Sequence, residues 1–288
     1  MFTQIQAEHL KPYILATECE MNVSDAVSAV REKLLEEEFE ILGDYSPAGE
    51  DTRRVLIVTH DELIDAVQQI GGFAGFAAAQ RIACTWENGS TYISYVDPEY
   101  IGNAYFQKNY PFVENNIKAV SNKLKTALKN IGSPRFRPFG SEDGLTPNKL
   151  QKYHYMFGME YFEDVVELNT FNHFEEAKST IEANFNDGNN GTIPVYSIEI
   201  PDKRLKLYGV GLSGERGESH FLPIIDINTP KHSAFLPYEI LVMDNEVVML
   251  HGRYRIALSF PDLTMMTFGR IMSTPGDIED YMQSLVER

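Results

Sequence analysis

Apolar residues recur at every third or fourth position after Asn22, which predicts an amphipathic helix. Its apolar face consists of Ala26, Val27, Val30 and Leu34, the spacing that places side chains on one side of a helix. Asn22 can cap this helix because Asp25 follows three residues later, where a polar side chain completes a reciprocal cap. A similar stripe recurs further along the chain at Ala177, Ile181 and Phe185.

Short apolar runs bounded by turn residues predict strands in the first half of the chain. Val55 to Val58 is uninterrupted and apolar, and the segments 82–86 and 90–96 flank Asn88-Gly89. This dipeptide adopts the positive φ values that a tight hairpin turn requires. The other expected elements are a strand at 39–42, a helix within 61–79 that ends in a Gly/Ala-rich stretch, and a helix whose apolar face runs from Val113 to Ile131.

Prolines and glycines then concentrate between 132 and 147, which predicts a boundary. The same succession of elements starts again beyond it. The pattern predicts strands at 155–168, 195–200 and 205–210, a hairpin of 238–243 and 247–258 around Asp244-Asn245, and a final helix from about Pro275.

The two halves therefore resemble each other at a nearly constant distance along the chain. Ala26 and Ala177 are 151 positions apart, and the turn residues Asn88 and Asp244 are 156 apart. A near-constant period favours duplication, and convergence of two α+β units is the alternative. We expect a first repeat at 1–132, a linker at 133–150 and a second repeat at 151–288, each packing its own helix on its own sheet around a separate core.

Composition narrows the class of function. The chain has 288 residues and a net charge of −17, which disfavours nucleic acid and anionic membrane surfaces because both attract basic proteins. The longest weakly polar run, 70–79, is too short to cross a bilayer. Only Cys19 and Cys84 are present, and residues 1–13 lack the pattern of a secretory signal, so we expect free thiols and a cytoplasmic location.

The end of each half carries a further pattern. In the second half Phe235-Leu236-Pro237-Tyr238-Glu239-Ile240-Leu241-Val242 precedes Asp244-Asn245, and in the first half Ala79 to Cys84 precedes Asn88-Gly89 and Asp97-Pro98. This arrangement resembles the bacterial domain-of-unknown-function family numbered 302, although Tyr238 stands where that family usually has Cys and the first half lacks Leu-Pro. The resemblance implies two similar α+β domains, each an antiparallel sheet with helices on one face (βαβ4α-like), as in the TATA-binding fold. It implies little chemistry.

Candidate binding residues gather in the second half. His220, Asp226, His232 and Glu239 are all possible ligands of a divalent metal, but their spacing matches no compact metal motif. We therefore assign no metal ligands and name His220, Asp226 and His232 as candidate binding residues, which could converge at one end of the sheet although scattered loop positions are the commoner outcome for such residues.

A second candidate is a row of basic residues after Asp244-Asn245. On the expected strand, His251, Arg253 and Arg255 share parity and so face one side of the sheet. In an acidic chain such a row can attract an anion, whereas ion pairs with the surplus carboxylates would explain it equally well.

Two further patterns have ordinary explanations. Gly209 to Gly214 has the spacing of a dinucleotide-binding loop, but no helix is expected after it, which favours a flexible turn. Cys84 and His60 form a catalytic pair only if the fold brings them together. A helix-capping His and a buried Cys would give the same sequence.

These observations leave the function open between three classes. The first is a noncatalytic binding module for a small ligand or a partner protein, with the two halves packed like a dimer within one chain or the chain forming a homodimer. The second is an enzyme that uses His220 or His232 with a carboxylate, with or without a metal. The third is a regulatory protein whose acidic surface selects a basic partner. No cofactor is indicated.

Overall fold

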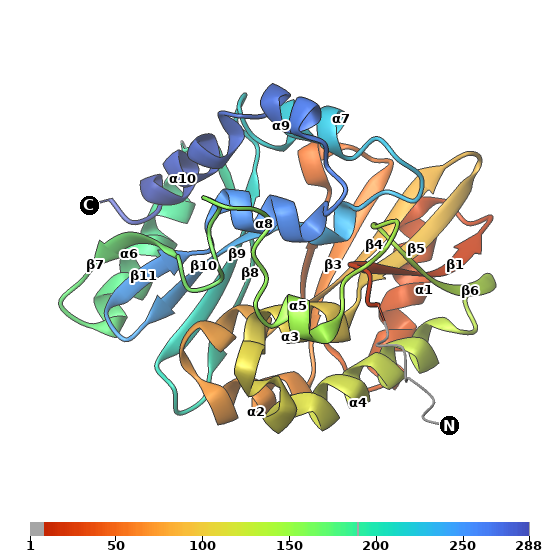
Figure 1. Cartoon of the computed structure of the whole chain (residues 1–288), viewed down its shortest axis with the longest axis horizontal. Coiled ribbons are helices and arrows are strands. Elements are labelled where there is room, and N and C mark those ends of the chain that lie inside the picture. The colour runs from red at the N-terminus through yellow and green to blue at the C-terminus, as the bar shows by residue number, and fades with distance from the viewer. Residues whose placement is uncertain (1–8, 189, 288) are drawn as a thin grey trace.

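The chain forms two antiparallel sheets, one from each half (Figure 1). The computed structural model describes residues 9–188 and 190–287. In spatial order, the first sheet contains β2 (Glu40–Tyr45), β3 (Arg53–Thr59), β4 (Gln80–Glu87), β5 (Ser90–Val96), β1 (Tyr13–Cys19) and β6 (Ser133–Phe139). The second contains β8 (Thr192–Ile200), β9 (Leu205–Leu212), β10 (Tyr238–Met243), β11 (Glu246–Met249) and β7 (Val166–Thr170).

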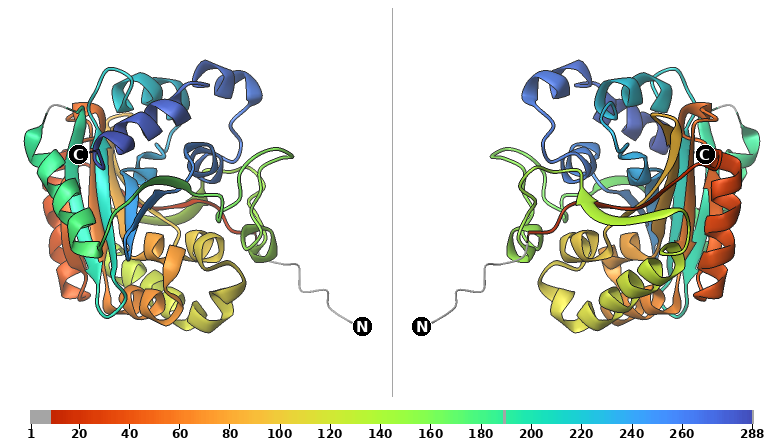
Figure 2. Two further views of the ribbon diagram at one scale, coloured as in Figure 1. Left: turned by 90° about the vertical axis from the view of Figure 1, so that its left-hand side faces the viewer. Right: turned by 90° about the vertical axis from the view of Figure 1, so that its right-hand side faces the viewer.

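Helices cover both sides of these sheets. The helices of the first half are α1 (Val23–Glu36), α2 (Asp61–Ile70), α3 (Pro98–Phe106), α4 (Tyr110–Leu128) and α5 (Pro147–Leu150), with short 3₁₀ turns η1 (Pro47–Gly49), η2 (Gly72–Ala77) and η3 (Gln107–Asn109). Those of the second are α6 (Phe174–Asp187), α7 (Glu218–Ile225), α8 (Gly252–Ser259), α9 (Met265–Arg270) and α10 (Thr274–Ser284), with η4 (Ser233–Phe235). Figure 2 shows α1 and α6 on one side of the sheets and α2, α8 and α9 on the other.

The α+β class with antiparallel sheets is thus confirmed, and the helical cover extends further than expected. Val55, Leu56, Ile57 and Val58 of β3 are all fully buried. Successive residues of a strand point to opposite faces. Both faces of this strand are therefore packed against other parts of the protein.

The two sheets have the same strand order. β2-β3-β4-β5-β1 in the first corresponds to β8-β9-β10-β11-β7 in the second, and β6 is an additional strand beside β1. The strand irregularities also correspond: Ala16 in β1 and Leu168 in β7 each form a bulge, as do Leu42 in β2 and Val195 in β8. Bulges are inherited features of a fold. The shared order and the matching bulges support the predicted duplication.

The helix that opens each repeat begins as its sequence indicates. Asn22 caps α1 by accepting a hydrogen bond from the Asp25 amide at 2.9 Å. Of the predicted face, Ala26, Val30 and Leu34 are fully buried. In α6 the equivalent residues Ala177 and Ile181 are also fully buried.

The two halves meet along equivalent edge strands, and an equivalent short segment of each half packs on the sheet of the other. The edge strand β2 lies against the edge strand β8 so closely that a Cβ on Gly43 would be 2.2 Å from the Val195 carbonyl oxygen. The turn η2 of the first half packs on β9 and β10, and η4 of the second half packs on β3, β4 and β5. Each half therefore completes the cover of the other half's sheet.

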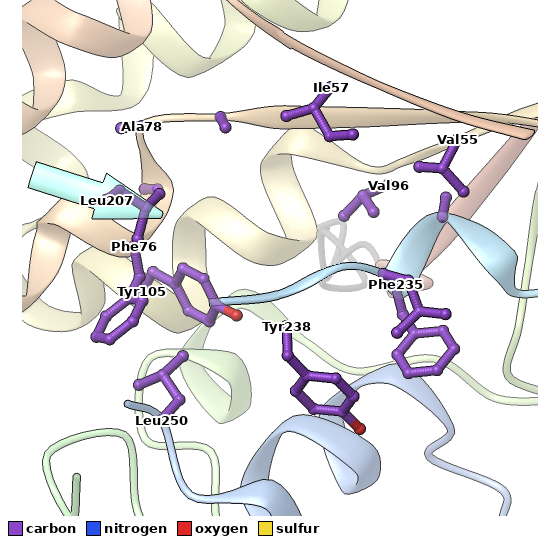
Figure 3. Packing of buried hydrophobic residues seen from close by; sticks show 14 of the residues in the cluster. Val55, Ile57, Phe76, Ala78, Val96, Tyr105, Leu207, Phe235, Tyr238 and Leu250 are labelled. Atoms are coloured by element: carbon purple, nitrogen blue, oxygen red, sulfur yellow. The ribbon is translucent and has the colours of Figure 1, made fainter. Parts of the chain in front are cut away.

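The expectation of two separate cores is wrong. The buried apolar side chains form one continuous cluster that runs through both halves. In Figure 3, Phe76 and Tyr105 of the first half lie in the same packed region as Leu207 and Tyr238 of the second. The reciprocal placement of η2 and η4 explains this continuity, because each carries buried side chains across the junction.

Four local expectations also differ from the structure. The strand expected at 155–168 is restricted to β7, and the strand expected at 247–258 ends at Met249 and is followed by α8. A helix, α7, does form after the glycine-rich segment 209–214, with Pro223 inside it. The segment 133–150, expected to be a linker, contains β6 and α5. The domain limits themselves stay a prediction.

Candidate functional site

A cavity of about 430 Å³ lies where the two halves meet. The first half contributes Lys11 and the end of β6 from Arg137 to Ser141, and the second half contributes the end of α7, the loop 227–232 and the segment 260–267. This volume is in the range of small-molecule sites. We refer to it as the junction cavity.

The charged groups of the junction cavity differ in whether they already have partners within the protein. Asp262 is already occupied, because its two carboxylate oxygens accept hydrogen bonds from the Ser141 hydroxyl at 3.1 Å and the Glu142 amide at 2.6 Å. The Lys11 ammonium donates to the Glu142 carbonyl at 2.9 Å. Among the described residues Arg137 has no ion-pair partner, and it is exposed. The guanidinium of Arg137 is therefore available to an anion.

His232 forms a buried part of the cavity wall. Its ring stacks on Phe260, with ring centroids 4.7 Å apart, and also packs against Tyr13 and Phe139. Burial lowers the pKa of His232, while the Asp226 carboxylate acts in the opposite direction. The ring nitrogen Nδ1 is buried and has no hydrogen-bond partner among the described residues.

Asp226 fixes the loop that carries His232. One carboxylate oxygen accepts the His232 backbone amide at 2.6 Å, and the other accepts the Ser233 hydroxyl at 2.9 Å and Arg53 Nη1 at 3.1 Å. Arg53 belongs to β3, so this network joins the two halves. The carboxylate bonds to the backbone of His232 and not to its ring, so it orders the loop and does not form a catalytic dyad.

A second buried charge network lies deeper between the halves. Arg81 of β4 and Arg255 of α8 are 2% and 4% exposed, and both pair with Glu239 of β10. Two hydroxyls also join this network. The Tyr105 hydroxyl lies 2.8 Å from Arg255 Nη1, and the Tyr196 hydroxyl donates to Glu239 Oε1 at 3.0 Å. Burial is the main cause that lowers the pKa of Arg81, and the positive charge of the neighbouring Arg255 lowers it further.

A third buried carboxylate, Glu218, joins η1 to α7. It accepts hydrogen bonds from the Tyr45 hydroxyl at 3.0 Å, the Ala48 amide at 2.8 Å and the Leu212 amide at 3.1 Å. Burial nevertheless raises the pKa of Glu218 to about 7. Its hydrogen-bond donors come from both halves. Its protonation state therefore affects how strongly the two halves are held together.

The residues predicted from the sequence are only partly brought together. Asp226 and His232 lie together, but His220 is exposed on α7 and does not join them. Arg255 points into the protein interior, whereas His251 and Arg253 both lie near Glu160, at 3.6 and 2.7 Å.

The predicted basic face is therefore wrong. It required a strand, and these residues instead cap and form α8, where the helical period turns Arg253 and Arg255 to different sides. His251 is the N-cap of that helix and accepts a hydrogen bond from the Arg253 amide.

The structure agrees with a helix-capping role for His60 and a packing role for Cys84. His60 caps α2 by accepting the Glu62 amide at 3.0 Å. Cys84 is fully buried, and burial raises the pKa of its thiol well above the usual range. A thiol in that state is a poor nucleophile, and both cysteines are free.

Several residues of the site were not identified from the sequence. Arg81 carries the clearest signal, since it is a charged residue inside the apolar strand 80–84 and such a charge needs a buried partner. Arg137 and Glu218 lie in segments with no periodic pattern, and only the packing of the halves brings them to the junction.

Within 9–188 and 190–287, no group of three or more His, Cys, Asp and Glu side chains is placed to hold a metal ion. In the same ranges no helix has the length and apolar character needed to cross a bilayer.

The chain has similar counterparts among solved structures. No family model and no curated protein matches the chain. A solved structure described as an uncharacterized conserved protein, DUF302, from Bacillus stearothermophilus is similar at 17% identity, with a TM-score of 0.36, over 40% of this chain and 94% of that chain. Its description carries the same family number, 302, that the sequence pattern resembles.

Proposed function

We propose that this protein is a noncatalytic binding protein whose ligand is a small organic anion held in the junction cavity. The observation that supports this most strongly is the cavity itself, which both halves build and in which Arg137 has no ion-pair partner among the described residues. Each half contributes its own surface to the wall of this cavity, and ligands commonly bind between two such units.

The chemistry of the walls defines the ligand class. Lys11 and Arg137 supply two positive charges, while the single carboxylate, Asp262, is already hydrogen-bonded within the protein. Phe139 and Phe260 supply an apolar surface. These features favour a molecule with a carboxylate or phosphate at one end and a ring or short apolar body at the other.

The walls favour binding over catalysis. His232 is the titratable base in the cavity wall, and its ring lacks the carboxylate partner that would orient it for proton transfer. The alternative, an enzyme that depends on His232, predicts conversion of a bound ligand, which binding alone does not. A cytoplasmic location and a pseudo-dimeric monomer are part of the same proposal.

The test is a thermal-shift titration followed by calorimetry with phenyl phosphate, AMP, citrate and benzoate as probes. We expect at least one probe to bind saturably and Arg137→Gln to weaken it by about 10-fold or more, because a charge-assisted hydrogen bond contributes about 1.5–3 kcal/mol. Arg135→Gln is the matched control, since Arg135 lies on the same strand but pairs with Glu18.

A second variant blocks the space without changing charge. Thr267→Phe places a ring in the cavity wall and is expected to abolish binding. Binding that survives both Arg137→Gln and Thr267→Phe would place the ligand elsewhere and overturn the proposal. Conversion of the probe, followed by NMR and lost in His232→Phe, would replace binding with catalysis.

A further inference from the structure

The buried network of Arg81, Arg255 and Glu239 carries an excess positive charge. Arginine stays protonated in proteins, and all three side chains are at least 96% buried. Both guanidinium groups share the single carboxylate of Glu239. The neighbouring Tyr105 and Tyr196 are neutral hydroxyls, so one of the two positive charges lacks a counter-charge in this cluster.

The hydrogen bonds of the two arginines are also incomplete. Arg255 Nη2 donates to the Phe235 carbonyl at 2.7 Å and to the Pro237 carbonyl at 3.1 Å. The Nε atoms of Arg81 and Arg255 are buried and have no acceptor among the described residues. A buried donor without an acceptor is uncommon, because it loses its bond to water and gains nothing in return.

A small cavity lies beside this network. It has a volume of about 20 Å³ and is separate from the junction cavity. Its wall contains Arg81 and Arg255 and no Asp or Glu. The nearby hydroxyls of Tyr13 and Tyr100 already donate to the carbonyls of Ser259 and Leu258. A space of this size holds one water molecule or one monatomic ion.

We propose that this cavity binds a monovalent monatomic anion of the halide class, with chloride as the physiological member. An anion would neutralise the surplus charge and accept from otherwise unused N–H groups, whereas water would do only the second. Glu239, Arg255 and the cavity wall draw on both halves, so the anion stabilises the junction. This proposal is independent of the ligand of the junction cavity.

The test compares the thermal stability of the full chain in chloride, bromide and gluconate at equal ionic strength. The expected result is a saturable rise in Tm with chloride and bromide and none with gluconate, which is too large for the cavity. Bromide-soaked crystals are expected to show an anomalous peak between the two guanidinium groups. Equal Tm values in all three salts, or a water without anomalous signal at that position, would overturn the proposal.

Variants identify the residues responsible. Arg81→Met removes one guanidinium group while keeping a long side chain, and is expected to abolish the difference between chloride and gluconate. Arg270→Met is the control, because Arg270 is exposed and lies outside the cavity. A chloride effect that persists in Arg81→Met contradicts the assignment. If that variant fails to fold, the wild-type titration and the bromide crystals still decide the question.

Discussion

Replacing Glu218 by Gln tests how charge is accommodated at the junction of the two halves. Glu218 is 1% exposed, and its carboxylate receives three hydrogen bonds, two of them from first-half residues Tyr45 and Ala48. Burial disfavours the charged form, while the donors favour it. Burial prevails, and the pKa of Glu218 rises from 4.5 to about 7.

The magnitude follows from this difference in pKa. The rise from 4.5 to about 7 corresponds to about 3 kcal/mol, at about 1.4 kcal/mol per pKa unit. Because the folded protein holds the proton more tightly than the unfolded chain, the stabilising contribution is fully present below pH 4.5. It is lost as the pH rises through about 7.

The assay is urea unfolding of the wild type and Glu218→Gln at pH values from about 4.5 to 9, followed by far-UV circular dichroism. Gln cannot titrate, so the difference between the two proteins isolates Glu218 from every other group. We expect Glu218→Gln to gain about 3 kcal/mol relative to the wild type between the two ends of this range. A difference that does not change with pH would refute the reasoning. A difference of opposite sign would mean that the three donors outweigh burial.

Two further predictions concern the junction and its cavity. Gly43→Ala is expected to destabilise the protein by about 1–3 kcal/mol, because the new Cβ meets the Val195 carbonyl and the strands β2 and β8 must separate. The measurement is the same urea assay. Gly276→Ala is the control, since Gly276 has open space around it. For His232, the lowered pKa means that the unfolded chain takes up the proton first, so the contribution of His232 to stability is expected to fall as the pH drops below 6.5. His232→Phe keeps an aromatic ring and removes that part of the acid sensitivity; identical pH dependence in both proteins would contradict the assignment.

The local elements and their repetition could be predicted from the sequence because they depend on neighbouring residues. The cap at Asn22, the stripe of Ala26 and Ala177, and the turn at Asn88-Gly89 each encode a local geometry. The class of the fold followed from the order of these elements.

The errors arose where the partner of a segment is distant in the chain. The strand β11 ends at Met249 because His251 caps a helix that begins just after it. In the sequence, this cap and the apolar residues after it look the same as a continued strand. The separation into two cores failed because the turns η2 and η4 cross to the opposite sheet, which no local pattern records. For the same reason Arg137 and Glu218 could not be assigned to the junction.

The central claim is that two repeated halves share one core and fold as a single unit. Differential scanning calorimetry of the full chain tests it most directly. The continuous cluster of buried side chains predicts one unfolding transition in which the calorimetric and van't Hoff enthalpies agree. Two resolved transitions, or a van't Hoff enthalpy about half of the calorimetric value, would show that the halves unfold independently and would contradict the account.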